Sequence, residues 1–154
     1  MKKIIFLFIV SLSCLKGYSQ SASDSSASQG IKIFPDKIIW TDAKPPLPPG
    51  AKTVILEGNP KQPGIYTIRM KFPPHYKLAA HLHPADERVT VLSGSINVGT
   101  GDKLDEKNAT HYTAGCFYVN RAGVHHYVFT GDEEAVFQLT GIGPWGIDFI
   151  DGKK

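Results

Sequence analysis

Short segments with regularly spaced apolar residues, separated by turn-forming residues, run from residue 53 to the end of the chain. The pattern is clearest in residues 65–72, where every second position is apolar: Tyr66, Ile68, Met70 and Phe72. Arg69 and Lys71 lie between them. Because side chains two apart in a strand share a face, this segment is predicted to be a half-buried strand.

Similar patterns predict further strands in residues 54–56, 78–83, 87–92, 96–100, 116–119, 125–129 and 135–142, and one more in residues 143–150. Fifteen glycines and eleven prolines lie mostly between these segments, and no segment has a convincing helical period. The predicted fold class is all-β, an antiparallel double-sheet sandwich or barrel. Residues 45–52, PPLPPGAK, are expected to form an extended strap over the edge of the domain, with a motif for a proline-binding partner as the alternative.

The first nineteen residues have a different composition. Lys2 and Lys3 precede an apolar run over residues 4–12, and the small residues Gly17 and Ser19 follow. This is the layout of a secretory signal peptide, and the run is too short to be read first as a membrane span. We therefore predict a signal peptide at 1–19, a flexible linker at 20–35, and a domain at 36–151, in an exported protein that is periplasmic or secreted, with no membrane span in the mature chain.

Two alternatives concern the same segment. The apolar run could remain as an uncleaved anchor, or Cys14 could carry a lipid that anchors the protein. The residues before Cys14, Ser11 to Ser13, match a lipidation signal poorly, because such signals prefer leucine three positions before the cysteine.

Charge excludes some partners. The net charge is +3, from 17 basic and 14 acidic residues, but Lys2, Lys3 and Lys16 lie in the predicted signal peptide, which leaves 14 of each sign. A neutral domain without a basic cluster offers no electrostatic footprint for nucleic acid or an anionic membrane. Small molecules, metal ions and proteins remain as partners.

His81 and His83 lie two apart in a predicted strand, so their side chains project to one face with roughly 6–7 Å between their Cα atoms. Two imidazoles at this separation can share one metal ion. Glu87 shares its parity with Val89 and Val91, which are expected to face the interior. A buried carboxylate is strongly destabilising without a positively charged partner, and a divalent metal ion would supply that charge.

A third histidine follows the glycine turn at Gly123. His125 shares its parity with Tyr127 and Phe129, and His126 shares its parity with Val128. Both faces are apolar, so periodicity does not decide which histidine faces inward. Gln138, with Val136 and Thr140, is expected to give the interior one amide.

These residues resemble the two motifs of the cupin family. His81-x-His83, three residues, Glu87, six residues and Gly94 match the first motif, and Gly115, five residues, Arg121-x-Gly123, two residues and His126 resemble the second. The resemblance implies a small cupin-type jelly-roll barrel in which His81, His83, Glu87 and His126 hold one metal. The chain departs from the family pattern at three turn or framework positions, where it has His75, Arg121 and Thr130.

Three histidines and one carboxylate leave one or two positions open on a six-coordinate divalent ion, which is typical of a reactive centre. Manganese, iron, nickel, copper, cobalt and zinc all suit these ligands. The leading hypothesis is a small metalloenzyme of dioxygenase or isomerase type that acts on a small organic molecule, with Glu87 as the catalytic base.

Two other functions are compatible with the sequence. One is a periplasmic metal-binding or ligand-binding sensor module without catalysis, and the other is a structural barrel that forms a homodimer through its outer sheet. The volume of the interior cavity should distinguish an enzyme from a sensor. An enzyme needs a substrate-sized cavity beside the metal, whereas a sensor functions with a nearly filled barrel.

Overall fold

The structure, a computed structural model, describes residues 30–150, and the compact unit begins at Ile31. The predicted signal peptide, the lipidation site at Cys14 and most of the predicted linker lie outside the described residues. The boundaries 1–19, 20–35 and 36–151 therefore stay predictions. No helix in the described part of the chain is long and apolar enough to cross a membrane.

The described residues form strands and two short 3-10 helices, η2 (Pro35–Lys37) and η3 (Glu106–Asn108). The strands in chain order are β1 (Thr41–Asp42), β2 (Lys52–Glu57), β3 (Gly64–Phe72), β4 (Lys77–Leu82), β5 (Glu87–Ser93), β6 (Ser95–Thr100), β7 (Thr110–Thr113), β8 (Phe117–Asn120), β9 (His126–Phe129), β10 (Ala135–Gly143) and β11 (Asp148–Phe149).

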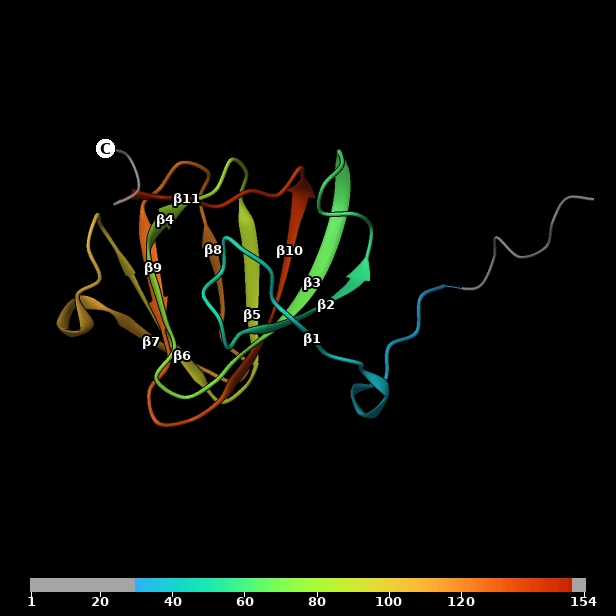
Figure 1. The fold of residues 1–154 in the computed structure, drawn as a ribbon, viewed down its shortest axis with the longest axis horizontal. Helices are drawn as coiled ribbons and strands as arrows, with labels where there is room; N and C mark the ends of the chain where they lie inside the picture. Colours follow the sequence, from blue (N-terminus) through green and yellow to red (C-terminus); the bar gives the residue numbers. More distant parts are fainter. Residues whose placement is uncertain (1–29, 151–154) are drawn as a thin grey trace, which may run out of the picture. The chain divides into compact units, whose positions relative to one another are not determined.

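These strands build two antiparallel sheets that face each other (Figure 1). The six-stranded sheet has the order β1-β2-β3-β10-β5-β8, and the five-stranded sheet has the order β11-β4-β9-β6-β7. The predicted all-β, double-sheet jelly roll is confirmed, although the hydrogen-bonded ladders remain two sheets and do not close into one continuous barrel.

The hydrophobic core lies between the two sheets. Tyr66, Ile68, Met70 and Phe72 of β3 are buried there, as their shared parity predicts, and so are Val89 and Val91 of β5. The prediction for Gln138 is wrong. Alternate residues of β10, Ala135, Phe137 and Leu139, face the core, so Gln138 lies on the outer face and accepts a hydrogen bond from Arg69 (2.9 Å).

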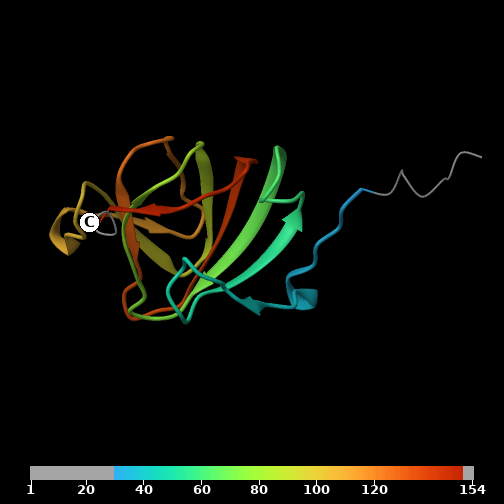
Figure 2. The same cartoon turned by 45° about the horizontal axis from the view of Figure 1, so that its top comes forward.

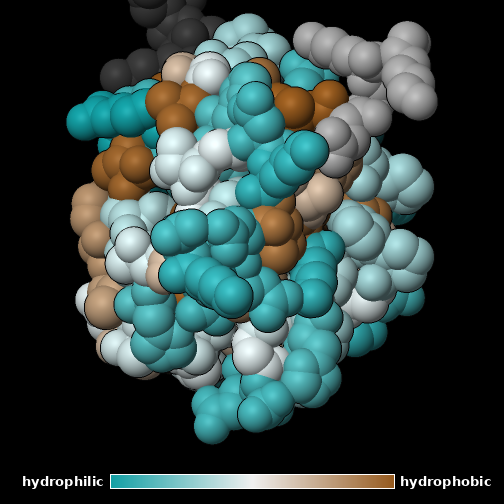
Figure 3. Space-filling view, turned by 90° about the vertical axis from the view of Figure 1, so that its left-hand side faces the viewer, coloured by the Kyte–Doolittle hydropathy of each residue, from teal (hydrophilic) through white to brown (hydrophobic). Residues whose placement is uncertain are grey.

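Two strands were not predicted. β7 lies in a polar segment with no apolar alternation, and its pairing with β6 brings Thr110 opposite Val98 and Thr113 opposite Ser95. β1 has only two residues and pairs with β2. Both are edge strands, whose outward surfaces need no apolar pattern. The face on the side of β6 and β7 is accordingly largely hydrophilic, with separated hydrophobic groups (Figure 3).

Residues 43–51 form the loop between β1 and β2 and cover the edge of the domain, where an extended strap over residues 45–52 was predicted. The extended conformation is wrong, because the backbone has turns at residues 45–46 and 49–50 and Lys52 already belongs to β2. We call residues 43–51 the strap. Leu47 inserts its side chain into the core, and the Tyr76 hydroxyl donates a hydrogen bond to the Pro48 carbonyl oxygen (2.8 Å). Figure 2 shows β2, next to the short edge strand β1, on the side of its sheet away from the strands of the five-stranded sheet. The strap is therefore the main cover over the inner face at this edge.

Candidate metal centre

A β-bulge in β4 sets the orientation of the first two histidines. Leu78 pairs with Val128 of β9 and His81 pairs with His126, so two residues of β4 lie opposite one residue of β9. In a regular strand Leu78 and His81 would point to opposite faces, because they lie three positions apart. The extra residue of the bulge lets both side chains face the core. His83 follows on the same inner face just after β4 ends.

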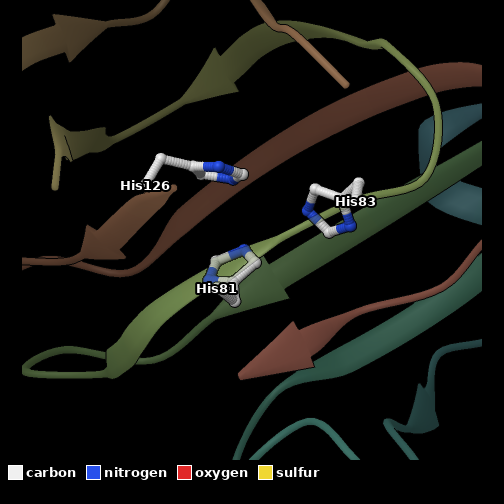
Figure 4. Close-up of side chains that lie close together, drawn as sticks. All are labelled: His81, His83 and His126. Atoms are coloured by element: carbon white, nitrogen blue, oxygen red, sulfur yellow. The ribbon is translucent and has the colours of Figure 1, made fainter. Parts of the chain in front are cut away.

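His126 is the first residue of β9, and it meets the other two histidines across the β4–β9 pairing (Figure 4). One ring nitrogen of each histidine lies within 4.8 Å of the corresponding atoms of the other two. The side chains are almost fully buried, with exposed fractions of 1%, 4% and 3% for His81, His83 and His126. We call these three residues the histidine cluster.

Backbone carbonyl groups fix the rings of the histidine cluster. Nδ1 of His81 lies 2.7 Å from the Ala79 oxygen, Nδ1 of His83 lies 2.6 Å from the Gly146 oxygen, and Nδ1 of His126 lies 3.0 Å from the Val124 oxygen. Since a carbonyl only accepts, each Nδ1 carries the hydrogen and each Nε2 is left to act as an acceptor or ligand.

The Nε2 atom of His126 differs from the others in its hydrogen bonding. It is buried and has no hydrogen-bond partner among the described residues. An unpartnered buried acceptor normally costs about 1–3 kcal/mol. Its lone pair faces the other two imidazoles, and a divalent metal ion bound by the three rings would satisfy it. The residues present therefore fit a metal ion of the type that imidazole prefers.

Glu87 opens β5 and lies beside the cluster, with an exposed fraction of 4%. Its Oε2 lies 3.0 Å from Nε2 of His83 and accepts a longer hydrogen bond from Asn120 (3.3 Å). Its Oε1 accepts a short hydrogen bond from the indole nitrogen of Trp145 (2.6 Å). The structure thus brings all four predicted residues together, and whether Glu87 is a fourth ligand stays a prediction.

Burial and neighbouring charges shift the pKa values of the three clustered histidines in different directions. Burial lowers the pKa of His81 to about 3, and the neighbouring His126 adds to this effect. Burial also lowers the pKa of His126. Both rings are therefore neutral at pH 7, which is the form that binds a metal.

His83 and Glu87 form a coupled pair. Burial on its own would lower the pKa of His83, but the hydrogen bond and the negative charge of Glu87 raise it above its usual value. Burial on its own would raise the pKa of Glu87, but the hydrogen bond and the charge of His83 lower it. Without a metal ion, a proton shared by this pair therefore compensates the buried carboxylate.

The other histidines lie away from the cluster. Nδ1 of His125 lies 2.6 Å from an oxygen of Asp102 near the surface, which shows that His126 is the histidine of this pair that faces inward. His75 is exposed and lies 3.6 Å from Asp132.

Sequence reasoning missed Trp145 and Asn120, the two side chains that donate to Glu87. Trp145 lies in the segment GPWG, for which the sequence predicted only a strand. Its ring stacks on His83, with 6.0 Å between the ring centroids and 24° between the planes. Nothing in the sequence around Asn120 points to this contact, because the pairing of Asn120 with Glu87 depends on the register of β5 and β8.

The cavity at the histidine cluster is small, about 30 Å³. Because one water molecule needs about 10–15 Å³ on this measure, there is room for an ion and one or two waters. An organic substrate does not fit without movement of the walls. A larger and more polar cavity of about 340 Å³ adjoins it between β6, β7 and β8, and shares His126, Tyr118 and Asn120 with it.

A family model of the cupin domain matches residues 68–141, a range that includes β4, β5, β9 and all four predicted metal ligands. A search of curated proteins found no match to the chain.

Many solved structures share the fold. The polyketide cyclase RemF from Streptomyces resistomycificus has a TM-score of 0.67 at 14% identity, over 79% of this chain and 86% of that one. A proposed acetylacetone dioxygenase from Methylibium petroleiphilum has a TM-score of 0.62 at 17% identity, over 81% and 85% of the two chains.

An RmlC-like cupin from Shewanella frigidimarina has a TM-score of 0.56 at 17% identity, over 74% of this chain and 91% of that one. At these identities the structures establish the fold alone. The family model supplies the sequence relationship, over the same strands that carry the histidine cluster. Residues 68–141 of the chain match the cupin domain in sequence, and the described residues share its fold.

Proposed function

We propose that this protein binds one divalent transition metal ion through His81, His83 and His126 and acts on a small organic molecule beside it. The observation that carries the proposal is the buried, unpartnered Nε2 of His126, together with three rings whose Nδ1 atoms are tied to carbonyl groups. A bound ion of this class supplies a Lewis-acid centre and, for manganese, iron, nickel, copper or cobalt, a redox centre.

Glu87 is the proposed catalytic base. Its Oε1 is held by Trp145, whereas Oε2 is the atom beside Nε2 of His83, and the residue lines the cavity of the histidine cluster. When His83 uses its Nε2 lone pair as a ligand, it no longer shares a proton with Oε2. That oxygen is then available either as a fourth ligand or to accept a proton from a substrate. A dioxygenase or an isomerase would both use such a base.

Fold neighbours support an enzyme in general but no particular reaction. They include a polyketide cyclase, a proposed acetylacetone dioxygenase and an oxalate oxidase, which share the fold at 24% identity or less. One observation favours the second candidate, a metal-binding or ligand-binding sensor without catalysis: the cavity of about 30 Å³ is nearly filled. We further propose export to the periplasm by a signal peptide at residues 1–19, from the composition of that segment.

The metal content of the untagged mature protein, purified from its native compartment, tests the proposal. We expect about one equivalent of metal in the wild type and its loss in the double variant His81→Ala, His83→Ala. A matched control, His75→Ala with His111→Ala, removes two exposed histidines and should keep the metal. Absence of metal from the wild type, or equal content in the cluster variant, would contradict the proposal.

The identity of the metal then directs the next experiment. A redox-active metal leads to a screen for oxygen consumption with diketones, enediols, flavonols and thiols. Zinc favours an isomerase or a sensor, because zinc has no redox chemistry. If the metal-loaded protein neither consumes oxygen nor isomerises any of these compounds, the sensor is the better description. Activity that Glu87→Gln leaves unchanged would contradict the role of Glu87 as the base.

A further inference from the structure

A large groove lies beside the small cavity of the histidine cluster. It has a volume of about 770 Å³ and runs between the strap, β2 and the segment of Trp145. We call it the strap groove and define it by Ile39, Leu47, Ile55 and Ile147, all of which line it. Its volume lies within the range of about 300–1,000 Å³ that is common for sites of small organic ligands.

The floor of the strap groove is an inner sheet face that the second sheet leaves uncovered. Ile55 of β2 pairs with Ile68 of β3, so both side chains point to the inner face. Ile68 is buried, whereas Ile55 is 54% exposed and Ile39, at the rim, is 82% exposed. Large apolar side chains gathered in a concave, open site are a common sign of a binding surface.

The charges at the groove favour an anion. Asp42 lines it but forms an ion pair with Lys52 (2.8 Å). Lys44 and Lys61 also line it, and neither forms an ion pair with any residue in the described range 30–150. An apolar floor with two uncompensated lysines complements a ligand that has an apolar body and a carboxylate.

The strap groove and the cavity of the histidine cluster share a wall. Leu47, Met70, Trp145 and Ile147 line both. Trp145 is the member of this wall that is hydrogen-bonded to Glu87, and its backbone N–H donates to Pro60 at the other side of the groove (2.6 Å). A ligand in the groove would therefore be one layer of side chains away from Glu87 and the histidines.

We propose that the strap groove binds the apolar body of a small carboxylic acid, that Lys44 and Lys61 hold its carboxylate, and that Trp145 separates it from the histidine cluster. Binding in the groove needs no metal. That the bound acid is the substrate, reached by movement of Trp145, rests on the function proposed above, since the cluster's own cavity is too small for an organic molecule.

Calorimetric titration of the mature protein with 2-naphthoate tests the binding step. We expect one molecule bound per chain, and loss of binding in Ile55→Glu, because a carboxylate would then stand on the apolar floor. Ile65→Glu is the matched control. Ile65 is 61% exposed on β3 and does not line the groove, so this variant should bind as the wild type does.

Charge recognition is tested with two further variants. Lys44→Gln combined with Lys61→Gln should weaken binding of 2-naphthoate about tenfold and leave binding of the uncharged 2-naphthol unchanged. Lys103→Gln combined with Lys107→Gln removes two lysines that do not line the groove and should change neither affinity. An equal loss for both probes would overturn the role given to the lysines.

Two results would overturn the groove as a ligand site. One is the absence of 2-naphthoate binding to the wild type, or equal binding to Ile55→Glu. The other is a dimer of the wild type that Ile55→Glu converts into a monomer, which would show that a second copy covers the groove. The metal content and the 2-naphthoate binding of the wild type separate the two proposals: metal without 2-naphthoate binding contradicts only the groove, and 2-naphthoate binding without metal contradicts only the metal centre.

Discussion

At the scale of single residues, the buried carboxylate of Glu87 organises the interior. It lies among apolar side chains, where an unpaired charge would be strongly destabilising. Three donors compensate it from three different segments: His83 after β4, Asn120 at the end of β8, and Trp145 in the loop before β11. The same contacts hold the ring of His83 in place, so the carboxylate and the histidine cluster depend on one another.

Replacement of Trp145 by phenylalanine tests this dependence. Trp145→Phe keeps a ring against His83 but removes the donor to Oε1 of Glu87. We expect the free energy of unfolding to fall by about 1–3 kcal/mol, as when one partner of a buried polar group is lost. Urea denaturation of the metal-free protein measures it. Trp40→Phe is the control, because Trp40 does not line the cluster cavity, and a similar loss there would argue against the Glu87 contact.

The pH dependence of stability follows from the same cluster. Burial lowers the pKa of His81 to about 3 and also lowers that of His126, whereas both titrate near 6.5 in the unfolded chain. As the pH falls below 6.5, the unfolded chain binds these protons and the folded protein does not, so the folded state loses stability. His83 has a raised pKa and adds no slope below pH 6.5, because it is charged in both states there.

We therefore expect the free energy of unfolding of the metal-free protein to fall between pH 6.5 and pH 5, by about 1.4 kcal/mol per pH unit for His81, with His126 adding to the fall in the same direction. Denaturation curves at several pH values measure this slope. His81→Asn should have a shallower slope, whereas His111→Asn, at an exposed position, should keep the wild-type slope. A slope that His81→Asn leaves unchanged would show that His81 is not held neutral.

At the scale of elements, close contacts between neighbouring strands fix the position of His126. Gly99 of β6 pairs with Tyr127 of β9, next to His126. A Cβ atom at Gly99 would lie 2.1 Å from the Tyr127 ring. The absence of a side chain on β6 thus lets the Tyr127 ring lie across β6 and donate to the Asp105 carbonyl oxygen (2.9 Å). Glycine has a packing role here, since it allows close approach.

Gly99→Ala should destabilise the protein by about 1–3 kcal/mol, because the added methyl group forces Tyr127 and β9 to shift. Thermal and urea unfolding measure the change. Gly131→Ala is the matched control, because a Cβ there would have no heavy atom within 4 Å and the backbone needs no positive φ. If both variants unfolded alike, the close packing of β6 and β9 would not be the cause.

At the scale of the whole molecule, the two sheets form a sandwich that is filled at the centre and open at one edge. The core side chains reduce the cavity at the histidine cluster to about 30 Å³, whereas the uncovered end of the six-stranded sheet leaves the strap groove. The cluster joins β4 and β9 of the five-stranded sheet, and Glu87 brings β5 of the other sheet against it. A metal ion at this point would stabilise the contact between the sheets.

Removal of the metal should therefore lower the stability of the whole domain. A ligand that binds only the folded state at 100 times its Kd adds about 2.7 kcal/mol. We expect treatment with a chelator to lower Tm by several degrees and re-addition of metal to restore it, as measured by calorimetry. In the double variant His81→Ala, His83→Ala neither treatment should change Tm. A chelator effect of equal size in that variant would place the stabilising ion elsewhere.

Much of this molecule followed from the sequence. The alternation of apolar and polar residues in residues 65–72 and 87–92 determined which side chains of β3 and β5 enter the core, because strand periodicity is a local property. The spacing of His81, His83 and Glu87 and the later His126 was sufficient to suggest the cluster and the cupin family. At residues 125–129 both parities are apolar, so periodicity gave no decision between His125 and His126. At residues 135–142 the inward position expected for Gln138 was wrong, because the more apolar set, Ala135, Phe137 and Leu139, faces the core.

The tertiary structure decided what depends on contacts between distant segments. The bulge in β4 follows from its pairing with β9, and the partners of Glu87 come from β8 and from the loop before β11. The strap groove exists because one sheet extends past the other. These features depend on register and on the relative size of two sheets. Neither is encoded in a single segment, so only the folded chain decides them.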